Sequence, residues 1–193
     1  MNRLTQTYTE TDDETLMKWL GKGDEKAFVE LYGRYSQRLL DYFYRMLGRD
    51  EEKAQDFLQD LFLKLVEKPH LYDSRRKFST WLYAVAANMC KNEYRSREVR
   101  KIMETVSDFG PEAPREKPDD EGIDRVWFET GLMHELENLS VEHRSVFLLR
   151  YQEERSVKEI SEILGCTEGT VKSRTFYALR KLAQRLHLFN PKL

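Results

Sequence analysis

The sequence predicts an all-α protein of two small helical domains that are joined by a flexible acidic linker. Apolar residues recur at steps of three and four in every strong pattern, and no stretch alternates with the period of a β-strand. Three of the five prolines fall within residues 111–118, in a segment rich in acidic residues. A chain of 193 residues has room for one medium domain or two small ones, and the proline-rich segment favours two.

Residues 1–103 form the first predicted domain, a bundle of four helices. Thr11 and Glu14 match the two ends of a capping box that opens the first, short helix. The second helix is long, over about 25–47, because apolar residues recur along one face throughout. Asp24 is its expected cap, since an aspartate carboxylate accepts backbone N–H groups of the first turn.

The third and fourth helices of this domain each have a distinctive pattern. The third covers about 51–67, with a polar face opposite an apolar stripe that ends in Leu65 and Val66. The fourth follows Ser79, its expected cap, and becomes basic toward Arg100.

Residues 125–193 form the second predicted domain, which also contains four helices. Ser140 is the expected cap of the second helix, and Ser156 with Glu159 forms a capping box for the third. The last helix is expected over about 168–188. Residues expected to face the core are Val146, Phe147, Leu148 and Tyr151 of the second helix, and Val171 and Leu179 of the last.

Charge is distributed unevenly along the chain. The net charge of −2 by itself argues against a nucleic-acid binder, a class that is usually basic. The linker, 104–124, holds eight acidic and two basic side chains, so its net charge is −6 and the remainder carries +4. Five basic residues lie within 91–101 and five more within 170–187. Two phosphate-facing surfaces have this pattern, although one such tract alone is more typical of a solvated helix face.

Several classes of protein and site are not expected from the composition. No stretch approaches the roughly 18 consecutive apolar residues of a membrane span, and the first ten residues lack the apolar core of a secretory signal. Two cysteines are too few for a disulfide scaffold, so a reduced, cytoplasmic protein is expected. The four histidines are scattered, and no phosphate loop or nucleophile set occurs. We therefore expect no enzyme, no catalytic residues, no metal site and no cofactor.

Residues 157–181 carry the most specific motif of the chain. A short amphipathic helix, a turn opened by Gly165 and a second helix that becomes basic are typical of a helix-turn-helix. Thr167 and the free amides at the start of the second helix can meet a phosphate. The side chains expected to reach base edges in the major groove are Thr170, Lys172, Ser173 and Arg174. The motif predicts DNA binding; a helical hairpin that does not touch DNA is the alternative.

Six segments of the two domains carry a family resemblance. The first domain contains AFVELYGRYSQRLLDYFYRML (27–47), KAQDFLQDLFLKLVEK (53–68) and FSTWLYAVAANMCKNEYRSR (78–97). The second contains ENLSVEHRSVFLLRY, KEISEILG and EGTVKSR. These segments resemble regions 2 and 4 of a bacterial RNA polymerase sigma factor of the extracytoplasmic-function (ECF) group of the sigma-70 family. The resemblance implies a dissociable subunit that binds core polymerase, melts the −10 promoter element and reads the −35 element.

The resemblance also implies roles for particular residues. The β′ clamp coiled coil of core polymerase would bind Gln55, Asp56, Gln59, Asp60 and Lys64. A flipped base of the −10 element would be captured by the segment that contains Tyr72, Lys77, Phe78, Ser79, Thr80 and Trp81. Further −10 contacts would come from Asn88, Lys91, Asn92, Arg95 and Arg97. The −35 element would be contacted by Arg144, Thr167, Thr170, Lys172, Ser173, Arg174 and Tyr177.

Alternatives remain for these residues and for the whole chain. Without the resemblance, the polar residues of 53–68 are a solvated helix face, and Trp81 is as well explained by core packing. Glu93 and Glu98 make the −10 helix less basic than in many family members. The resemblance implies further partners in the β flap and an anti-sigma factor, with no membrane insertion and a monomer when free. A one-component helix-turn-helix regulator whose first domain senses a ligand is the alternative function.

Overall fold

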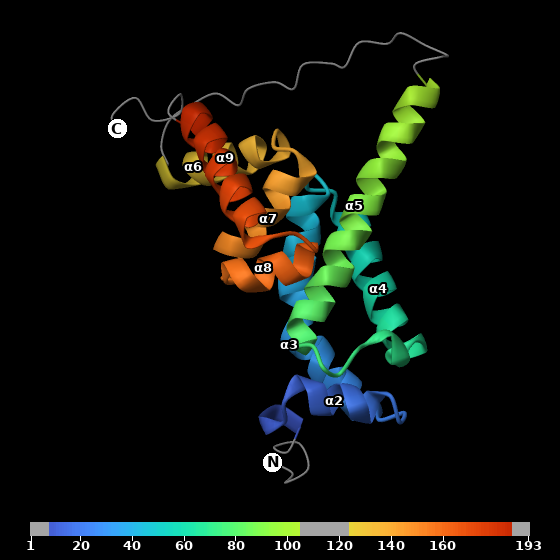
Figure 1. Cartoon of the computed structure of the whole chain (residues 1–193). Coiled ribbons are helices and arrows are strands. Elements are labelled where there is room, and N and C mark those ends of the chain that lie inside the picture. The colour runs from blue at the N-terminus through green and yellow to red at the C-terminus, as the bar shows by residue number, and fades with distance from the viewer. Residues whose placement is uncertain (1–7, 105–123, 187–193) are drawn as a thin grey trace.

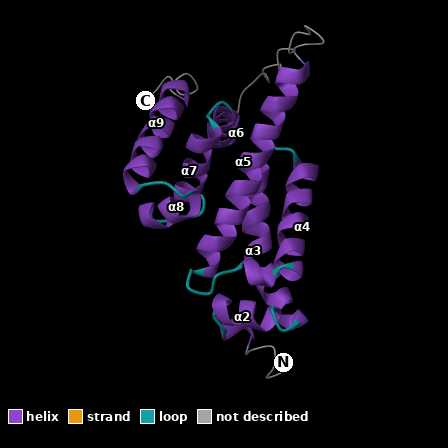
Figure 2. Ribbon diagram, turned by 45° about the vertical axis from the view of Figure 1, so that its right-hand side comes forward, coloured by secondary structure: helices purple, strands orange, loops and turns teal. Residues whose placement is uncertain are grey.

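The computed structural model describes residues 8–104 and 124–186, which form helices and contain no strand (Figure 2). This confirms the predicted all-α class with two helical domains. The predicted linker falls almost wholly on 105–123, which lie outside the described residues, so its boundaries remain predictions. Neither described stretch contains a helix long and apolar enough to cross a membrane.

Among the described residues, the first domain contains a short helical stretch at 8–10, four longer α-helices and one short 3-10 helix, and the second contains four α-helices (Figure 1). The first domain contains α2 (Asp13–Leu20), α3 (Glu25–Met46), α4 (Glu51–Glu67), η1 (Pro69–Leu71) and α5 (Phe78–Glu104). The second contains α6 (Asp124–Glu137), α7 (Val141–Tyr151), α8 (Val157–Leu164) and α9 (Glu168–Leu186).

Helix α3 lies at the centre of the first domain, with α2 across one end and α4 alongside (Figure 1). Its Leu31, Leu39 and Phe43 have no exposed surface. They pack with Leu61 of α4 and Leu82 of α5, both also buried. Burial of one such side chain contributes about 1.5–3 kcal/mol, so this shared core holds the long α5 against the bundle.

Three of the predicted helix caps are confirmed. The Asp24 carboxylate accepts the backbone N–H groups of Lys26 and Ala27 at the start of α3. Ser140 accepts an N–H in the first turn of α7. At α8 the predicted capping box is complete, because Ser156 and Glu159 each accept the other's backbone N–H. A helix begins at each of these positions because the cap supplies an acceptor to an otherwise unpaired N–H.

Two predicted caps are wrong. The cap of α2 is Asp12, whose carboxylate accepts the Thr15 N–H at 2.8 Å. Helix α5 begins at Phe78, one residue before the predicted cap Ser79. The carboxylate of Glu14 accepts the Phe78 N–H at 2.8 Å, so a residue expected to cap its own helix caps another.

Three side chains predicted to face the core lie on the surface. Tyr151 of α7 is 49% exposed, Leu179 of α9 is 42% exposed and Val66 of α4 is 46% exposed. In α9 the buried positions are Val171, Ala178 and Leu182, which follow one helical stripe. Leu179 is one residue past that stripe, and a step of one residue turns about 100° around the helix.

The two domains lie against one another along a contact that we call the domain seam. On one side are α3 and α5, and on the other are α6, α7 and α8 (Figure 1). The seam is rich in hydrogen-bonded polar side chains, which are Arg38, Tyr42, Ser79, Tyr83, Tyr94, Arg144, Ser145, Glu153 and Arg155.

Candidate functional site

One side of α4 presents a continuous exposed surface, which we call the α4 face. All five residues predicted to bind polymerase, which are Gln55, Asp56, Gln59, Asp60 and Lys64, are exposed. Leu63 and Val66 lie among them, 55% and 46% exposed. Sequence reasoning missed this apolar pair because it assigned Val66 to the core stripe. Apolar residues surrounded by polar ones are typical of a surface that binds another protein.

The loop before α5 ends in an aromatic cluster. The ring of Tyr72 lies 5.5 Å from that of Phe78 and 5.4 Å from that of Trp81. Tyr72 and Phe78 are buried, and the Tyr72 hydroxyl donates to the carbonyl oxygen of Arg76 at 2.7 Å. Burial, with the nearby carboxylates of Glu14 and Asp13, raises the pKa of Tyr72 to about 12. These two residues therefore shape the loop from within, whereas Trp81 is only half-buried.

A cavity, which we call the Trp81 cavity, opens beside this cluster. It is lined by Arg75, Arg76, Lys77, Thr80, Trp81 and Ala84 of the first domain and by Glu162 of α8. The Thr80 hydroxyl oxygen is buried and has no hydrogen-bond partner among the described residues. An indole ring, three cationic side chains and an unsatisfied hydroxyl suit a ligand with a flat ring, a polar edge and a phosphate.

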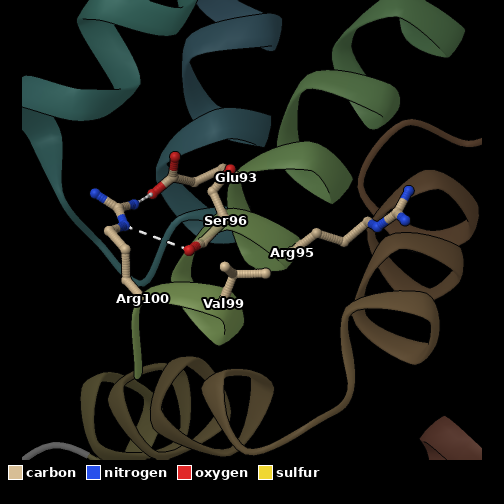
Figure 3. Close-up of a pocket in the computed structure, with 5 residues that line it drawn as sticks. All are labelled: Glu93, Arg95, Ser96, Val99 and Arg100. Carbon is tan, nitrogen blue, oxygen red and sulfur yellow. Dashed lines mark hydrogen bonds and ion pairs between the residues drawn. The ribbon is translucent and has the colours of Figure 1, made fainter. Parts of the chain in front are cut away.

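The basic half of α5 is only partly free. Asn88, Lys91, Asn92 and Arg95 are exposed, as expected for residues that meet DNA. Glu93, however, binds Arg97 at 2.8 Å and Arg100 at 3.3 Å. Figure 3 shows Arg100 turned toward Glu93 and the Ser96 carbonyl, while Arg95 extends away from them.

Glu93 is ionised when it binds these two arginine side chains. Partial burial would raise the pKa of Glu93, but hydrogen bonds from Lys53 and Arg97 outweigh it, and the pKa lies below its ordinary value. The positive charge is therefore lower on this side of α5 than on the side that carries Arg95. The sequence pattern identified Glu93 as a residue that lowers the positive charge of the helix, but not which basic side chains it neutralises.

The second helix of the helix-turn-helix presents its predicted contact residues together. Gly165 ends α8 in the left-handed conformation, with φ 61°, which a residue with a side chain rarely adopts. Thr167 then accepts the Thr170 N–H at 3.1 Å at the start of α9. The remaining predicted residues on this surface, Lys172, Ser173 and Tyr177, are exposed, and Arg174 is half-buried. Sequence reasoning missed Phe176, which is 59% exposed beside Tyr177.

Arg144 is not on this surface. It is 3% exposed and lies in the domain seam. Its guanidinium donates to the carbonyl oxygens of Leu136 at 2.8 Å, Met46 at 2.7 Å and Glu137 at 2.6 Å. It also binds the hydroxyl of Tyr94, whose ring it partly covers. In this arrangement Arg144 joins α7 to α5 and to the end of α3. The structure does not bring Arg144 together with the other predicted −35 residues.

The seam also covers part of the predicted −10 surface. Arg155 donates to the Ser79 hydroxyl at 3.1 Å and lies over the Tyr83 ring. Ser79 and Thr80 are each 4% exposed. On the surface nearby, Lys77 pairs with Glu159 of α8 at 3.1 Å.

Further along the seam, residues predicted to read different promoter elements line one cavity. Asn88 and Lys91 of α5 lie on one side of it, and Arg174 of α9 lies on the other. DNA could not reach both sets of residues while the domains are in contact here.

Comparison with known proteins identifies the family. The model of "Sigma-70 region 2" matches residues 31–100, and that of "Sigma-70, region 4" matches residues 131–182. The ECF RNA polymerase sigma factor SigW of Bacillus subtilis is 30% identical over 179 residues, covering 88% of this chain and 94% of that protein. The chain belongs to the ECF sigma factors of the sigma-70 family. A second relative, SigL of Mycobacterium tuberculosis, is 34% identical to this sigma factor over 156 residues, covering 79% and 84% of the two chains.

Solved structures share the fold of this sigma factor. CnrH, in complex with the cytosolic domain of CnrY, has a TM-score of 0.67 and 23% identity, with 92% of this chain and 99% of that chain covered. The sigma factor RpoE of Bartonella quintana, in complex with the anti-sigma factor NepR, has a TM-score of 0.66 and 21% identity, with 86% and 99% covered. As a member of the ECF group, the protein directs RNA polymerase to promoters. A one-component regulator is not favoured, because both sigma regions are present in order.

Acid should weaken the contact that this sigma factor makes through Glu159. Hydrogen bonds from the Ser156 backbone, then from its hydroxyl and from Lys77, lower the pKa of Glu159 from 4.5 to about 2, against the effect of partial burial. A lowered pKa in the folded state stabilises the protein above the unfolded value, and this stabilisation is lost as pH falls from about 4.5 to 2. Glu159→Gln should therefore be less stable than wild type at pH 6, with the difference shrinking toward pH 2. Urea unfolding midpoints measure this.

A matched variant, Lys77→Met, removes the partner across the seam and keeps the cap of α8. The difference in urea midpoint between Lys77→Met and wild type should also shrink as pH falls toward 2, but it should be smaller than the difference for Glu159→Gln. A Glu159→Gln difference that is constant from pH 6 to 2 would contradict the role of the ionised carboxylate.

Proposed function

We propose that the first domain of this sigma factor binds core RNA polymerase through the α4 face. The support is the exposure of all five predicted contact residues around the apolar pair Leu63 and Val66. Asp56 and Asp60 give the face acidic side chains that can pair with basic residues of the β′ clamp coiled coil. Charge complementarity of this kind sets the rate and the specificity of association.

The same domain captures a base of the −10 element on its own side of the Trp81 cavity, which is exposed once α8 has moved away. The unsatisfied Thr80 hydroxyl can bond the edge of an unstacked base, and Trp81 offers a surface on which the base stacks. Lys77, Arg75 and Arg76 can neutralise the phosphates on either side. Melting is then driven by the free energy of binding unstacked bases, so the subunit needs no catalytic residue, metal or cofactor of its own.

The basic half of α5 holds the neighbouring −10 DNA through Asn88, Lys91, Asn92 and Arg95. Arg97 also contributes, although its guanidinium is paired with Glu93.

The second domain reads the −35 element with α9. Thr167 and Thr170 lie at its start, and Lys172, Ser173, Arg174 and Tyr177 follow on the accessible side. The start of a recognition helix is the part that reaches base edges in the major groove.

Arg174→Ala should weaken binding to a specific −35 duplex by roughly 1–3 kcal/mol if the guanidinium contacts a base. Binding to a scrambled duplex should change much less. Fluorescence anisotropy at fixed salt measures both. Arg180→Ala removes an exposed cation of the same helix farther from its start, and it should weaken both duplexes about equally. Equal losses for Arg174→Ala on the two duplexes would show that Arg174 contacts only phosphate.

The domains separate before promoter DNA is bound, since the seam covers Ser79 and Thr80 and places Arg174 opposite Lys91. Arg144 is freed by the same step and can then reach the −35 backbone, as the resemblance implies. The polymerase β flap is a second docking site for region 4. An anti-sigma factor is a further partner, by analogy with the complex of RpoE with the anti-sigma factor NepR. The free protein is a cytoplasmic monomer without membrane insertion.

The function as a whole rests on one observation, the presence of both sigma regions in order along the chain. Run-off transcription with core polymerase and a library of random promoter templates tests it. Transcripts should appear only when the protein is added, and the selected templates should share two sequence elements. Failure of the protein to bind core polymerase would contradict the proposal.

A further inference from the structure

The start of α5 has no cap of its own. The residue before it is Lys77, whose side chain has no acceptor and pairs with Glu159. Within the first turn, the Ser79 hydroxyl receives Arg155 and the Thr80 hydroxyl has no partner among the described residues. Unpaired N–H groups in a first turn destabilise a helix start. The position at which α5 begins therefore has to be set by another part of the chain.

Helix α2 supplies the missing acceptor. Glu14 Oε1 accepts the Phe78 N–H at 2.8 Å across 64 residues of sequence. A carboxylate at this place also interacts favourably with the positive end of the helix dipole. Helix α2 lies before the residues matched to region 2, which begin at 31. The cap is thus provided from outside the matched segment.

Helix α2 is itself held in place on α3. Asp13 binds Arg34 at 2.7 Å and accepts the hydroxyl of Tyr35. The Tyr35 ring lies 5.6 Å from the ring of Phe78, which has no exposed surface. Phe78 is therefore fixed twice, through its backbone N–H by Glu14 and through its side chain by Tyr35. Adjacent carboxylates of α2 support both contacts, because Glu14 binds the Phe78 N–H directly and Asp13 holds Tyr35.

We propose that Glu14 is a positioning residue for capture of the −10 base. Thr80 and Trp81, which line the Trp81 cavity, are the third and fourth residues of α5, within the turn that Glu14 caps. Without the cap, this turn frays, and the hydroxyl and the indole lose their fixed separation. This inference rests on the base capture proposed above and adds to it the element that sets its geometry.

The test uses holoenzyme assembled from core polymerase and the full-length chain. The probe is a labelled non-template strand that spans the −10 element of a promoter selected from random templates. A second strand lacks the one base whose removal weakens wild-type binding most. The readout is the dissociation constant of the strand that lacks the base divided by that of the complete strand. This ratio reports base capture, because changes in phosphate contacts or in the fraction of active protein affect both constants equally.

Glu14→Ala should lower this ratio by about five-fold, the size expected when a helix cap is lost. Glu14→Gln keeps an acceptor oxygen at the same reach and should retain most of the ratio. Asp12→Ala is the matched control, because it removes the cap of α2 itself and leaves the Phe78 N–H paired. It should lower the unfolding midpoint by a similar amount and leave the ratio unchanged.

Three results would overturn the proposal. A wild-type ratio for Glu14→Ala shows that the cap does not affect base capture. An equal loss for Asp12→Ala reduces the effect to the stability of α2, and an equal loss for Glu14→Gln excludes the hydrogen bond as its cause. Trp81→Ala separates the two levels of inference. If Trp81→Ala leaves the ratio at its wild-type value, the cavity is not the capture site, and both the proposed base capture and the role of Glu14 are contradicted. If Trp81→Ala lowers the ratio to one while Glu14→Ala does not lower it, only the role of Glu14 is contradicted.

Discussion

Replacing Arg144 with alanine should lower the free energy of unfolding by about 3–4 kcal/mol, because several buried carbonyl oxygens lose a charged donor at once. The guanidinium reaches the carbonyls of Met46, Leu136 and Glu137 and the hydroxyl of Tyr94. Two of these partners belong to the first domain, so the loss falls on the domain seam as well as on α7. Urea unfolding followed by circular dichroism measures the change, and small-angle scattering measures any separation of the domains.

Arg150→Ala is the control for this prediction. Arg150 lies on the same helix, is exposed and donates one hydrogen bond to the carbonyl of Arg155. Its removal should cost less than about 1 kcal/mol. If Arg144→Ala were as mild, while weakening −35 binding, the arginine would act mainly on DNA and the seam would not depend on it.

Reversing the charge of the α4 face should weaken binding to core polymerase by roughly ten- to hundred-fold. The double variant Asp56→Lys, Asp60→Lys replaces two exposed acids that make no buried contact, so the fold should be retained. Biolayer interferometry with immobilised core polymerase measures the affinity. Binding of the full-length double variant to a −35 duplex should equal that of the wild-type chain, since α4 lies outside the second domain.

The matched control places the same four units of charge elsewhere. Glu10→Lys, Asp41→Lys alters two exposed acids outside α4 and should leave the polymerase affinity within about two-fold of wild type. Equal losses for both double variants would indicate that net charge governs association. A loss of secondary structure in the α4 variant would instead indicate misfolding.

The helices and most of their caps could be predicted because the signals for them are local. The carboxylate of Asp24 and the hydroxyls of Ser140 and Ser156 act on N–H groups two or three residues away. The cap that Glu14 provides for α5 could not be predicted, because its acceptor and donor are 64 residues apart. Periodicity likewise misplaced Val66, since a helix flank can point to solvent or to core with the same spacing.

The candidate site was predicted in part for the same reason. The α4 face and the start of α9 are each one side of a single helix, so their residues could be grouped from sequence. The Trp81 cavity combines a loop, the first turn of α5 and α8, and the unsatisfied Thr80 hydroxyl emerges only from their packing. The position of Arg144 depends on contacts between domains, which neither periodicity nor family resemblance specifies.

The polar character of the domain seam also determines how its opening responds to temperature. Exposing apolar surface raises the heat capacity of a protein, whereas exposing polar surface lowers it. Tyr42 with Ser145, and Tyr83 with Glu153, exchange partners for water when the domains part. The two contributions oppose each other, so the heat-capacity change of separation is small compared with that of unfolding. The enthalpy of separation is therefore nearly independent of temperature, and the logarithm of the equilibrium constant between joined and parted domains should be close to linear in 1/T, unlike the curved stability of the bundle itself.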